Sequence, residues 1–346
     1  MLRPVMIKGE LCCSVVTRYA TRDETKNPGF AEAVRLLEEK LGTEFLSLHL
    51  LTESEEVELK LGKWQRLRVK PVAKAPPLVL GHDRVKNRRV DVTAPYLKAL
   101  GVTDGLGRVR ERMGDKFRQI ERFVDLLHSA YQESSLSGRP EIRFCDMGAG
   151  KGYLTFAAYD YLSSRGARVA GEGVEVREDL VVLCNHVAAE CGWSEGLRFV
   201  QSSIERHPLE KVDILMALHA CNTATDDALA AGVKAGAEII LVAPCCHKEV
   251  RPQLKTGGPL ADVLRFGLFA ERHAEMATDA LRALLLEQAG YKVRVAEFVD
   301  AEHTARNVML LATRTGKAAE SRAERIAALK AFYGIEKHRL EELLVG

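Results

Sequence analysis

The chain has 346 residues, of which 47% are hydrophobic and 28% are charged, and its formal net charge is +2. This length exceeds the usual single domain and suffices to bury a sizeable core. No apolar run is long enough to cross a membrane, and Met1-Leu2-Arg3-Pro4 is not followed by the hydrophobic region of a secretory signal, so we expect a cytoplasmic protein. The eight cysteines lack the spacing of a disulfide framework and are expected to be thiols.

Residues 1–77 predict a small α+β module. Apolar residues at helical spacing predict a helix over 30–41, and apolar stretches separated by turn residues predict short strands over 45–51, 56–61 and 65–72. The proline-rich stretch from Pro71 to Pro77 is expected to be a linker.

A basic segment follows this module. From Lys63 to Arg118 the chain has fifteen Lys and Arg against five Asp and Glu, a surplus of ten that leaves the remainder of the chain at −8. Such a concentration of cations favours a phosphate backbone as partner, and we expect RNA. The alternative is a solvated basic surface or a set of internal ion pairs. Few aromatic residues lie among the cations, so base stacking is not indicated.

The rest of the chain predicts an α/β fold. Residues 78–138 form a basic connecting and helical region, with a helix over 115–131 that we expect to pack on a sheet. From Ile142 onward apolar strands alternate with helices, which predicts a parallel, doubly wound, Rossmann-like sheet over 139–316. Its last two strands, 292–299 and 308–313, are joined by too short a turn for a parallel crossover and must form an antiparallel hairpin. Residues 317–346 are expected to be a charged helical tail.

The most informative motif is an acid followed by a glycine turn at the end of the first of these strands. Asp146 ends a hydrophobic strand, and three candidate cofactor-binding glycines follow it, namely Gly148, Gly150 and Gly152. Glycines allow a sharp turn and close approach of the backbone to a ligand, at the beginning of a helix with free N–H groups. A Walker loop would need Gly-Lys-Ser/Thr, and the dinucleotide fingerprint would need a glycine at Tyr153. The pattern is typical of S-adenosylmethionine sites and predicts a methyltransferase.

Two further residues are predicted to bind the same cofactor. Glu175 closes the next strand at the distance along the chain where an acid can bind ribose hydroxyls, although Glu172 and Glu178 compete for this role. Ser203 follows the third strand, where a polar side chain often contacts adenine, and it is a weaker candidate.

Three clusters of Cys and His fall at the carboxyl ends of later strands, where ligands bind in open α/β sheets. They contain His219 with Cys221, Cys245 with Cys246 and His247, and His303 with Asn307. In the expected strand order these three ends are neighbours. We predict that His219, Cys221, Cys245 and His247 form the reacting rim, with His303 and Asn307 close by.

The chemistry of this rim remains open between four interpretations. A cysteine thiolate could add to a pyrimidine ring and activate its C5 carbon for methylation. A histidine could remove the proton of a hydroxyl group. The side chains offer enough ligands for zinc, but their spacings match no standard zinc module, so no metal is assigned. Finally, the cysteines could be small buried hydrophobes and the histidines structural.

The acid and glycine loop, Leu218-His-Ala-Cys, Pro244-Cys-Cys-His and His303-Thr-Ala-Arg-Asn together resemble a known domain. It is the methyltransferase domain shared by eukaryotic tRNA acceptor-stem 2′-O-methyltransferases, the methyltransferase-like-25 proteins and the glutathione S-transferase C-terminal domain-containing proteins. The resemblance covers residues 115–313 and implies a class I fold that uses S-adenosylmethionine, with the Cys and His segments lining the pocket. Asn222 stands where eukaryotic relatives tend to have glycine, and the zinc modules of the tRNA enzymes are absent from the sequence.

The sequence therefore predicts an S-adenosylmethionine-dependent methyltransferase, most simply one that modifies RNA, whether rRNA or tRNA, with Lys116 and Arg118 guiding the substrate. One alternative is methylation of a protein or a small molecule. A second alternative is a non-catalytic adaptor that holds S-adenosylmethionine or a metal and binds RNA. No membrane partner is expected.

Overall fold

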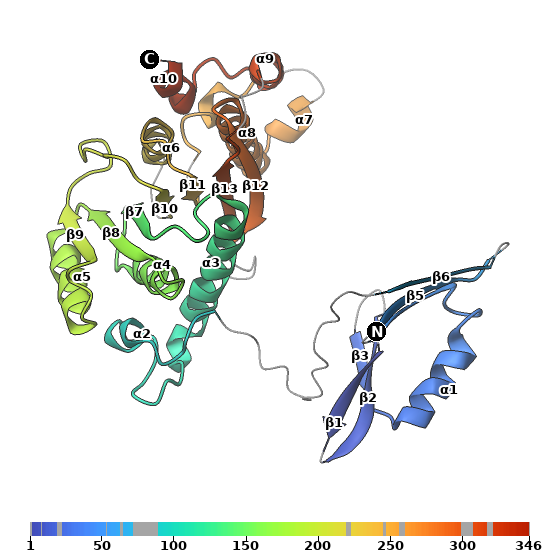
Figure 1. Cartoon of the computed structure of the whole chain (residues 1–346). Coiled ribbons are helices and arrows are strands. Elements are labelled where there is room, and N and C mark those ends of the chain that lie inside the picture. The colour runs from blue at the N-terminus through green and yellow to red at the C-terminus, as the bar shows by residue number, and fades with distance from the viewer. Residues whose placement is uncertain are drawn as a thin grey trace. The chain divides into compact units, whose positions relative to one another are not determined.

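The structure is a computed structural model that describes residues 2–7, 9–18, 23–52, 54–62, 65–71, 89–218, 223–244, 247–255, 260–298, 307–316 and 321–345. The chain divides into two compact units, Met1–Arg88 and Arg89–Gly346, which are described separately (Figure 1).

The described residues of the first unit form one helix and two three-stranded antiparallel sheets. The sheets have the orders β1-β2-β3 and β4-β5-β6. The elements are β1 (Leu2–Ile7), β2 (Glu10–Arg18), β3 (Asp23–Lys26), α1 (Phe30–Lys40), β4 (Ser47–Leu51), β5 (Glu55–Lys60) and β6 (Arg66–Pro71). The helix and the last three strands agree with the sequence prediction. The first three strands were not predicted, because Val5 and Cys13 are the only apolar residues buried among their described side chains and no clear alternation results.

The second unit is built on a seven-stranded sheet with the order β12-β13-β11-β10-β7-β8-β9. The strands are β7 (Glu141–Met147), β8 (Arg168–Glu175), β9 (Leu197–Gln201), β10 (Ile214–Ala217), β11 (Ile239–Val242), β12 (Tyr291–Glu297) and β13 (Val308–Arg314). Strands β7 to β11 are parallel, and β13 is antiparallel to both β11 and β12. The predicted Rossmann-like sheet and its terminal hairpin are therefore confirmed.

Helices cover both faces of this sheet (Figure 1). They are α2 (Pro95–Ala99), α3 (Gly114–Glu133), α4 (Tyr153–Ser163), α5 (Glu178–Glu190), α6 (Ala224–Lys234), α7 (Ala261–Leu264), α8 (Gly267–Gln288), α9 (Ala323–Tyr333) and α10 (Arg339–Val345), with short 3-10 turns at Glu111–Met113 and Arg251–Gln253. One hydrophobic core joins one face of the sheet to α3, α4 and α5, and the other joins the opposite face to α6, α8 and the C-terminal helices. The core on the α3 side confirms that this helix packs on the sheet.

Within residues 321–345, the C-terminal tail contains two helices instead of one continuous helix. Gly334 follows α9 with a φ of 74°, a left-handed conformation that ends the helix. Ile335 and Leu340 are then buried against the second core. Among the described residues, no helix combines the length and the apolar character that a membrane span requires.

Candidate cofactor site

The glycine loop joins β7 to α4 and is tied to the neighbouring strand. Gly148, Gly150 and Gly152 have φ values of 83°, 58° and 72°, which glycine adopts far more readily than other residues. The N–H groups of Gly148 and Ala149 both donate to the carbonyl oxygen of Val174 in β8, at 2.8 and 2.9 Å. The loop is therefore held at the carboxyl ends of two adjacent parallel strands, as the sequence predicted for a ligand site.

Asp146 lies next to this loop as a buried carboxyl group. Its exposed fraction is 3%, and Thr155 in the first turn of α4 donates its hydroxyl to Asp146 Oδ2 at 2.5 Å. The other oxygen, Oδ1, is buried and has no hydrogen-bond partner among the described residues. Burial raises the pKa of Asp146 to about 7, with the Thr155 hydrogen bond acting in the opposite direction and the nearby Glu175 charge adding to the rise. A buried carboxylate oxygen without a partner is costly, which suits a site that a cationic or hydrogen-bonding ligand completes.

Glu175 reaches the same loop from the end of β8. The N–H of Gly150 donates to Glu175 Oε2 at 2.8 Å, and the backbone N–H and Nε of Arg177 each donate to Oε1 at 3.1 Å. Burial opposes the ionisation of Glu175, but the hydrogen bonds from Arg177 and Gly150 outweigh it and hold the pKa of Glu175 below its usual value. Glu175 is therefore a negatively charged group fixed beside the glycine turn.

The structure distinguishes the three acids that the sequence left open for the ribose. Glu172 lies three residues before Glu175 on the same strand and therefore points to the opposite face of the sheet, where it contacts His207 and Arg198. Glu178 is exposed at the beginning of α5. Of the three, Glu175 has a hydrogen bond to the glycine loop.

Ser203 is the second residue after β9, near the end of β8. The preceding N–H, that of Ser202, donates to the carbonyl oxygen of Glu175 at 3.1 Å. The carbonyl oxygen of Ser203 accepts from the N–H groups of Arg206 and His207, at 3.2 and 3.0 Å. This turn places the half-buried Ser203 next to the carboxyl end of β8.

The predicted reacting rim is only partly described. Strands β10, β11 and β13 are adjacent, so the carboxyl ends of β10 and β11 and the beginning of the antiparallel β13 lie at the same end of the sheet. His219, Cys221, Cys245, Cys246 and His303 lie outside the described residues. Asn307 is described, and its amide donates to Glu297 Oε1 at 2.7 Å.

His247 is buried at this edge and belongs to a polar network. Its ring Nε2 lies 3.2 Å from Asp279 Oδ1 of α8, and its Nδ1 has no partner among the described residues. Arg282 Nη1 donates to the same Asp279 oxygen at 3.0 Å and forms a bidentate pair with Asp226 of α6 at 2.8 and 2.7 Å. The network joins His247 to two helices.

Lys116 and Arg118, the predicted substrate guides, lie near the beginning of α3. Lys116 Nζ is 5.3 Å from the ring centre of Tyr153, the first residue of α4. Burial lowers the pKa of Lys116. Arg118 forms an ion pair with Asp115 on its own helix. The half-buried Lys116 therefore lies beside the glycine loop, while Arg118 is exposed.

Three residues that sequence reasoning did not single out also support this site. Thr155 holds Asp146, and Arg177 holds Glu175. Cys184 of α5 lies with its sulfur 3.7 Å from the carbonyl oxygen of Gly150, and burial raises its pKa to about 12. A hydroxyl residue in the first turn of the helix after the glycine loop was a signal for Thr155. A surface arginine and a helical cysteine carried no such signal.

Comparisons with known proteins bear on the same region. A family model described as a methyltransferase domain matches residues 115–253, which is less than half of the chain. A search of curated protein sequences finds no match.

Several solved structures are similar to this chain at low identity. The magnesium protoporphyrin IX methyltransferase of Synechocystis with bound SAH is 13% identical, with a TM-score of 0.40, over 64% of this chain and 93% of that one. The SAH-bound methyltransferase PaMTH1 of Podospora anserina is 12% identical, with a TM-score of 0.39, over 65% and 88%. The ribosomal protein L11 methylase of Lactobacillus delbrueckii is 12% identical, with a TM-score of 0.34, over 56% and 79%. These similarities are too distant to bear on the substrate.

The family match falls on the strand, glycine loop and helices that form the site, and the sheet has the mixed order with a terminal hairpin that suits class I methyltransferases. The second unit therefore contains a class I methyltransferase domain, and its cofactor is S-adenosylmethionine.

The described residues fit this cofactor. Asp146 offers a buried oxygen that has no partner in the described part of the chain, and Glu175 offers a fixed carboxylate. A Cβ atom at Gly150 would have Arg177 Nη2 as its nearest neighbour, at 4.0 Å, so the turn leaves open space for a ligand. These groups, with Ser203, would hold the cofactor, which supplies a methyl group on a sulfonium centre.

Proposed function

We propose that this methyltransferase modifies RNA, with rRNA and tRNA as the candidates. The observation that carries the proposal is the position of Lys116, at 5.3 Å from the Tyr153 ring. This lysine belongs to the basic segment 63–118 and lies beside the first residue after the glycine loop. The segment therefore brings positive charge to the cofactor loop, where a polyanionic substrate would need it.

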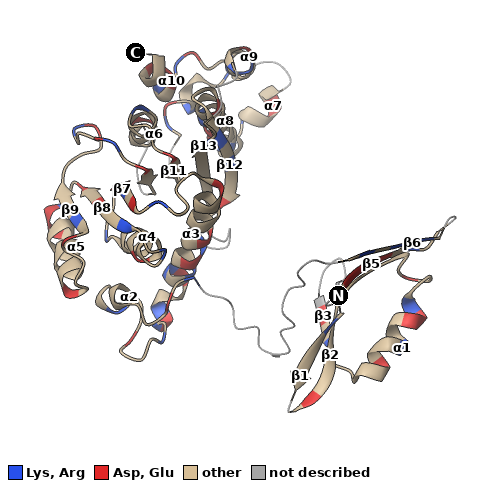
Figure 2. Cartoon of the chain, viewed as in Figure 1, with Lys and Arg blue, Asp and Glu red and all other residues tan. Residues whose placement is uncertain are grey.

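The described part of the basic segment contains cations that are available to phosphates. Lys98 and Arg112 are exposed and have no carboxylate partner within residues 89–218 or the other described ranges. Arg89 and Arg108, in contrast, are paired with Asp125 and Asp104. Figure 2 shows Lys and Arg residues around the beginning of α3. Lys98 and Arg112 are therefore two candidates for binding an RNA backbone.

The reacting groups proposed are the four rim residues His219, Cys221, Cys245 and His247. A thiolate among them would add to a pyrimidine ring, and an imidazole would remove a hydroxyl proton. The product distinguishes these two roles, because a C5-methylated pyrimidine requires the thiolate and a methylated hydroxyl requires a base.

The decisive experiment measures transfer of labelled methyl groups from S-adenosylmethionine to separated RNA, protein and small-molecule fractions of cells that lack this gene. We expect label in RNA with the wild-type protein and none with Asp146→Ala. Label in the protein or small-molecule fraction would contradict the RNA proposal, and the absence of label despite cofactor binding would favour a non-catalytic adaptor.

A binding experiment tests the role of the basic segment separately. We expect the affinity for RNA to fall as salt increases, and to fall further in the double variant Lys98→Ala, Arg112→Ala. The slope of log K against log salt should be shallower in that variant by about 0.7 for each phosphate that it no longer neutralises. Lys337→Ala removes an exposed cation from the C-terminal tail and is the matched control. If Lys337→Ala lowered the affinity as much per charge removed as the double variant does, a specific role for the segment would be ruled out.

A further inference from the structure

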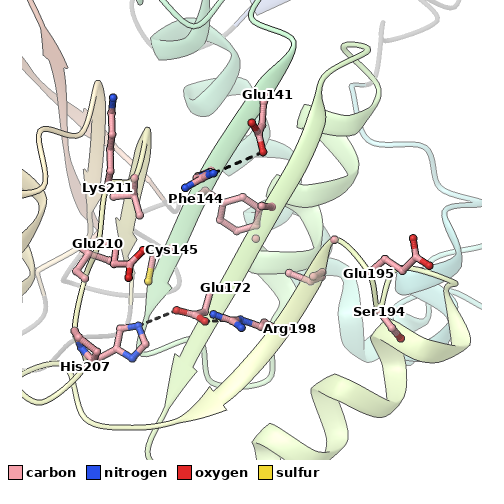
Figure 3. Close-up of a pocket in the computed structure, with 18 residues that line it drawn as sticks. Glu141, Phe144, Cys145, Glu172, Ser194, Glu195, Arg198, His207, Glu210 and Lys211 are labelled. Carbon is pink, nitrogen blue, oxygen red and sulfur yellow. Dashed lines mark hydrogen bonds and ion pairs between the residues drawn. The ribbon is translucent and has the colours of Figure 1, made fainter.

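One face of the sheet carries a polar cavity between β7, β8 and β9. The connection from β9 to β10, residues 202–213, contains no helix, although a helix is the usual cover of a parallel crossover. A cavity of about 530 Å³ lies there, lined by the first halves of the three strands and by residues 207–212 of the connection (Figure 3). The exposed sheet face is polar, because Arg143, Glu172 and Arg198 take positions where a covering helix would meet apolar residues.

Three side chains with metal-binding atoms meet at this cavity. A ligand atom of each of Cys145, Glu172 and His207 lies within 4.8 Å of those of the other two. Cys145 belongs to β7, Glu172 to β8, and His207 to the connection. Figure 3 shows the Glu172 carboxylate between the His207 ring and the Arg198 side chain, with the Cys145 sulfur on the same side as His207. The cluster lies on the face opposite to Asp146 and Glu175, because adjacent strand residues alternate between faces.

We propose that Cys145, Glu172 and His207 form a zinc site that is separate from the cofactor site. Thiolate, imidazole and carboxylate are the three ligand types that zinc takes in proteins, and three protein ligands with a fourth position open to water are typical of open zinc sites. A thiolate, a carboxylate and a neutral imidazole also balance the charge of a divalent ion.

The hydrogen bonds in the cluster already orient the ligands. His207 Nε2 and Glu172 Oε1 are 2.8 Å apart, while Arg198 Nε donates to the other oxygen, Oε2, at 2.6 Å. Zinc bonds of about 2.0 to 2.3 Å would require these two ligand atoms to separate slightly. Arg198 would keep its hydrogen bond to Oε2 and so fix the orientation of the carboxylate. Residues that hydrogen-bond a metal ligand commonly orient it in this way.

A thiol group distinguishes this cluster from an ordinary ion pair. Both oxygens of the Glu172 carboxylate already have partners, His207 and Arg198, so these ion pairs do not require a thiol nearby. Cys145 is nevertheless placed beside it, with an exposed fraction of 1%. Binding of one zinc ion would break the Cys145 S–H bond, form an S–Zn bond and release the proton to solvent.

The proposed ion would fix the connection between β9 and β10. It would link β7 and β8 to His207, whose N–H donates to the carbonyl oxygen of Ser203 at 3.0 Å. The turn that carries Ser203 would then be anchored at both ends, to Glu175 through Ser202 and to the metal through His207. Metal binding should therefore stabilise the folded protein, since a ligand that binds the native state alone does so.

The test uses the full chain, stripped with a chelator and titrated with Co²⁺ and then with Zn²⁺. We expect one Co²⁺ per chain, with a thiolate-to-cobalt charge-transfer band that Zn²⁺ abolishes, and a higher melting temperature with Zn²⁺. Cys145→Ser should remove the band, and His207→Ala should weaken the metal at least tenfold. Circular dichroism of each variant reports whether it folds. If Cys145→Ser does not fold, the metal affinity of His207→Ala still tests the proposal.

Two other cysteines provide controls. Cys191→Ser removes a partly exposed thiol from the end of α5 and should leave the band unchanged. Cys245→Ser should also leave it unchanged. Loss of the band in Cys245→Ser together with its retention in Cys145→Ser would place the metal at the rim and overturn the proposal. The absence of a stoichiometric metal would overturn it equally.

Discussion

Thr155 donates its hydroxyl to Asp146 Oδ2 at 2.5 Å and leaves Oδ1 of the same buried carboxyl without a partner among the described residues. The helix that follows the glycine loop thus fixes the acid that precedes it. One oxygen is used to hold the carboxyl in place, and the other is the one that we propose for the cofactor.

Asp146→Asn should weaken S-adenosylmethionine binding by about ten- to a hundredfold, because hydrogen bonds that involve a charged group contribute about 1.5 to 3 kcal/mol. Thr155→Val should weaken it less, since the carboxyl stays but loses its anchor. Isothermal titration calorimetry measures both affinities. A wild-type affinity in Asp146→Asn would contradict the assignment of the free oxygen to the cofactor.

Glu175→Gln should also lose cofactor affinity by about tenfold, because Glu175 is the acid that hydrogen-bonds Gly150. Glu178→Gln changes an exposed acid three residues later and is the matched control. The same calorimetric titration compares them. If Glu178→Gln lost as much affinity as Glu175→Gln, the geometry at the glycine loop would not explain the binding.

Gly152→Ala should destabilise the protein by about 2 to 4 kcal/mol in the free energy of unfolding. Its φ is 72°, and a Cβ atom would lie 2.9 Å from Phe156 and 3.1 Å from Cys184. Gly166→Ala is the control, because its φ is 82° but a Cβ atom there would meet nothing within 4 Å. Both variants have the backbone strain, and only Gly152→Ala adds the clash, so urea unfolding of the two separates these effects. Similar losses of unfolding free energy would show that the neighbours of Gly152 move enough to relieve the clash.

Arg282→Met should destabilise the protein by about 3 to 5 kcal/mol, because it leaves Asp226 buried and without its cationic partner. Lys292→Met removes a cation from an exposed pair with Glu133 and should cost about 1 kcal/mol or less. Denaturant unfolding provides the comparison. Comparable losses in the two variants would mean that the buried pair has no special role in holding α6 and α8 together.

Ionisation of the Asp160 carboxyl should make the folded protein less stable as pH rises. Burial, with the nearby Asp91 charge, raises the pKa of Asp160 to about 6. The folded state therefore holds this proton more tightly than the unfolded state, and stability declines between about pH 4 and pH 6 and stays lower above it. A rise of about two pKa units corresponds to about 3 kcal/mol. Because Asp160 is only half-buried, solvent screening reduces this value, and Asp160→Asn should be more stable than the wild type at pH 7 by about 1 to 3 kcal/mol, with the difference vanishing near pH 4. Thermal unfolding at several pH values tests this, and a pH-independent difference would point to a cause other than ionisation.

Periodicity and turn residues were sufficient for most of the second unit. Apolar strands and helices alternate clearly from Ile142 onward, because strands buried on both faces are almost entirely hydrophobic. The same reasoning missed β1, β2 and β3, where few side chains are buried. The tail was expected to be helical, but Gly334 divides it into α9 and α10.

The sequence by itself determined that an acid and three glycines stand between a buried strand and a helix, and that Glu172 and Glu175 must point to opposite faces of their strand. Only the tertiary structure decided which face carries α4 and the glycine loop, and so which glutamate reaches Gly150. It alone also placed His207 beside Cys145 and Glu172. Local patterns depend on neighbouring residues, whereas contacts between distant residues depend on the strand order and on the paths of the connections.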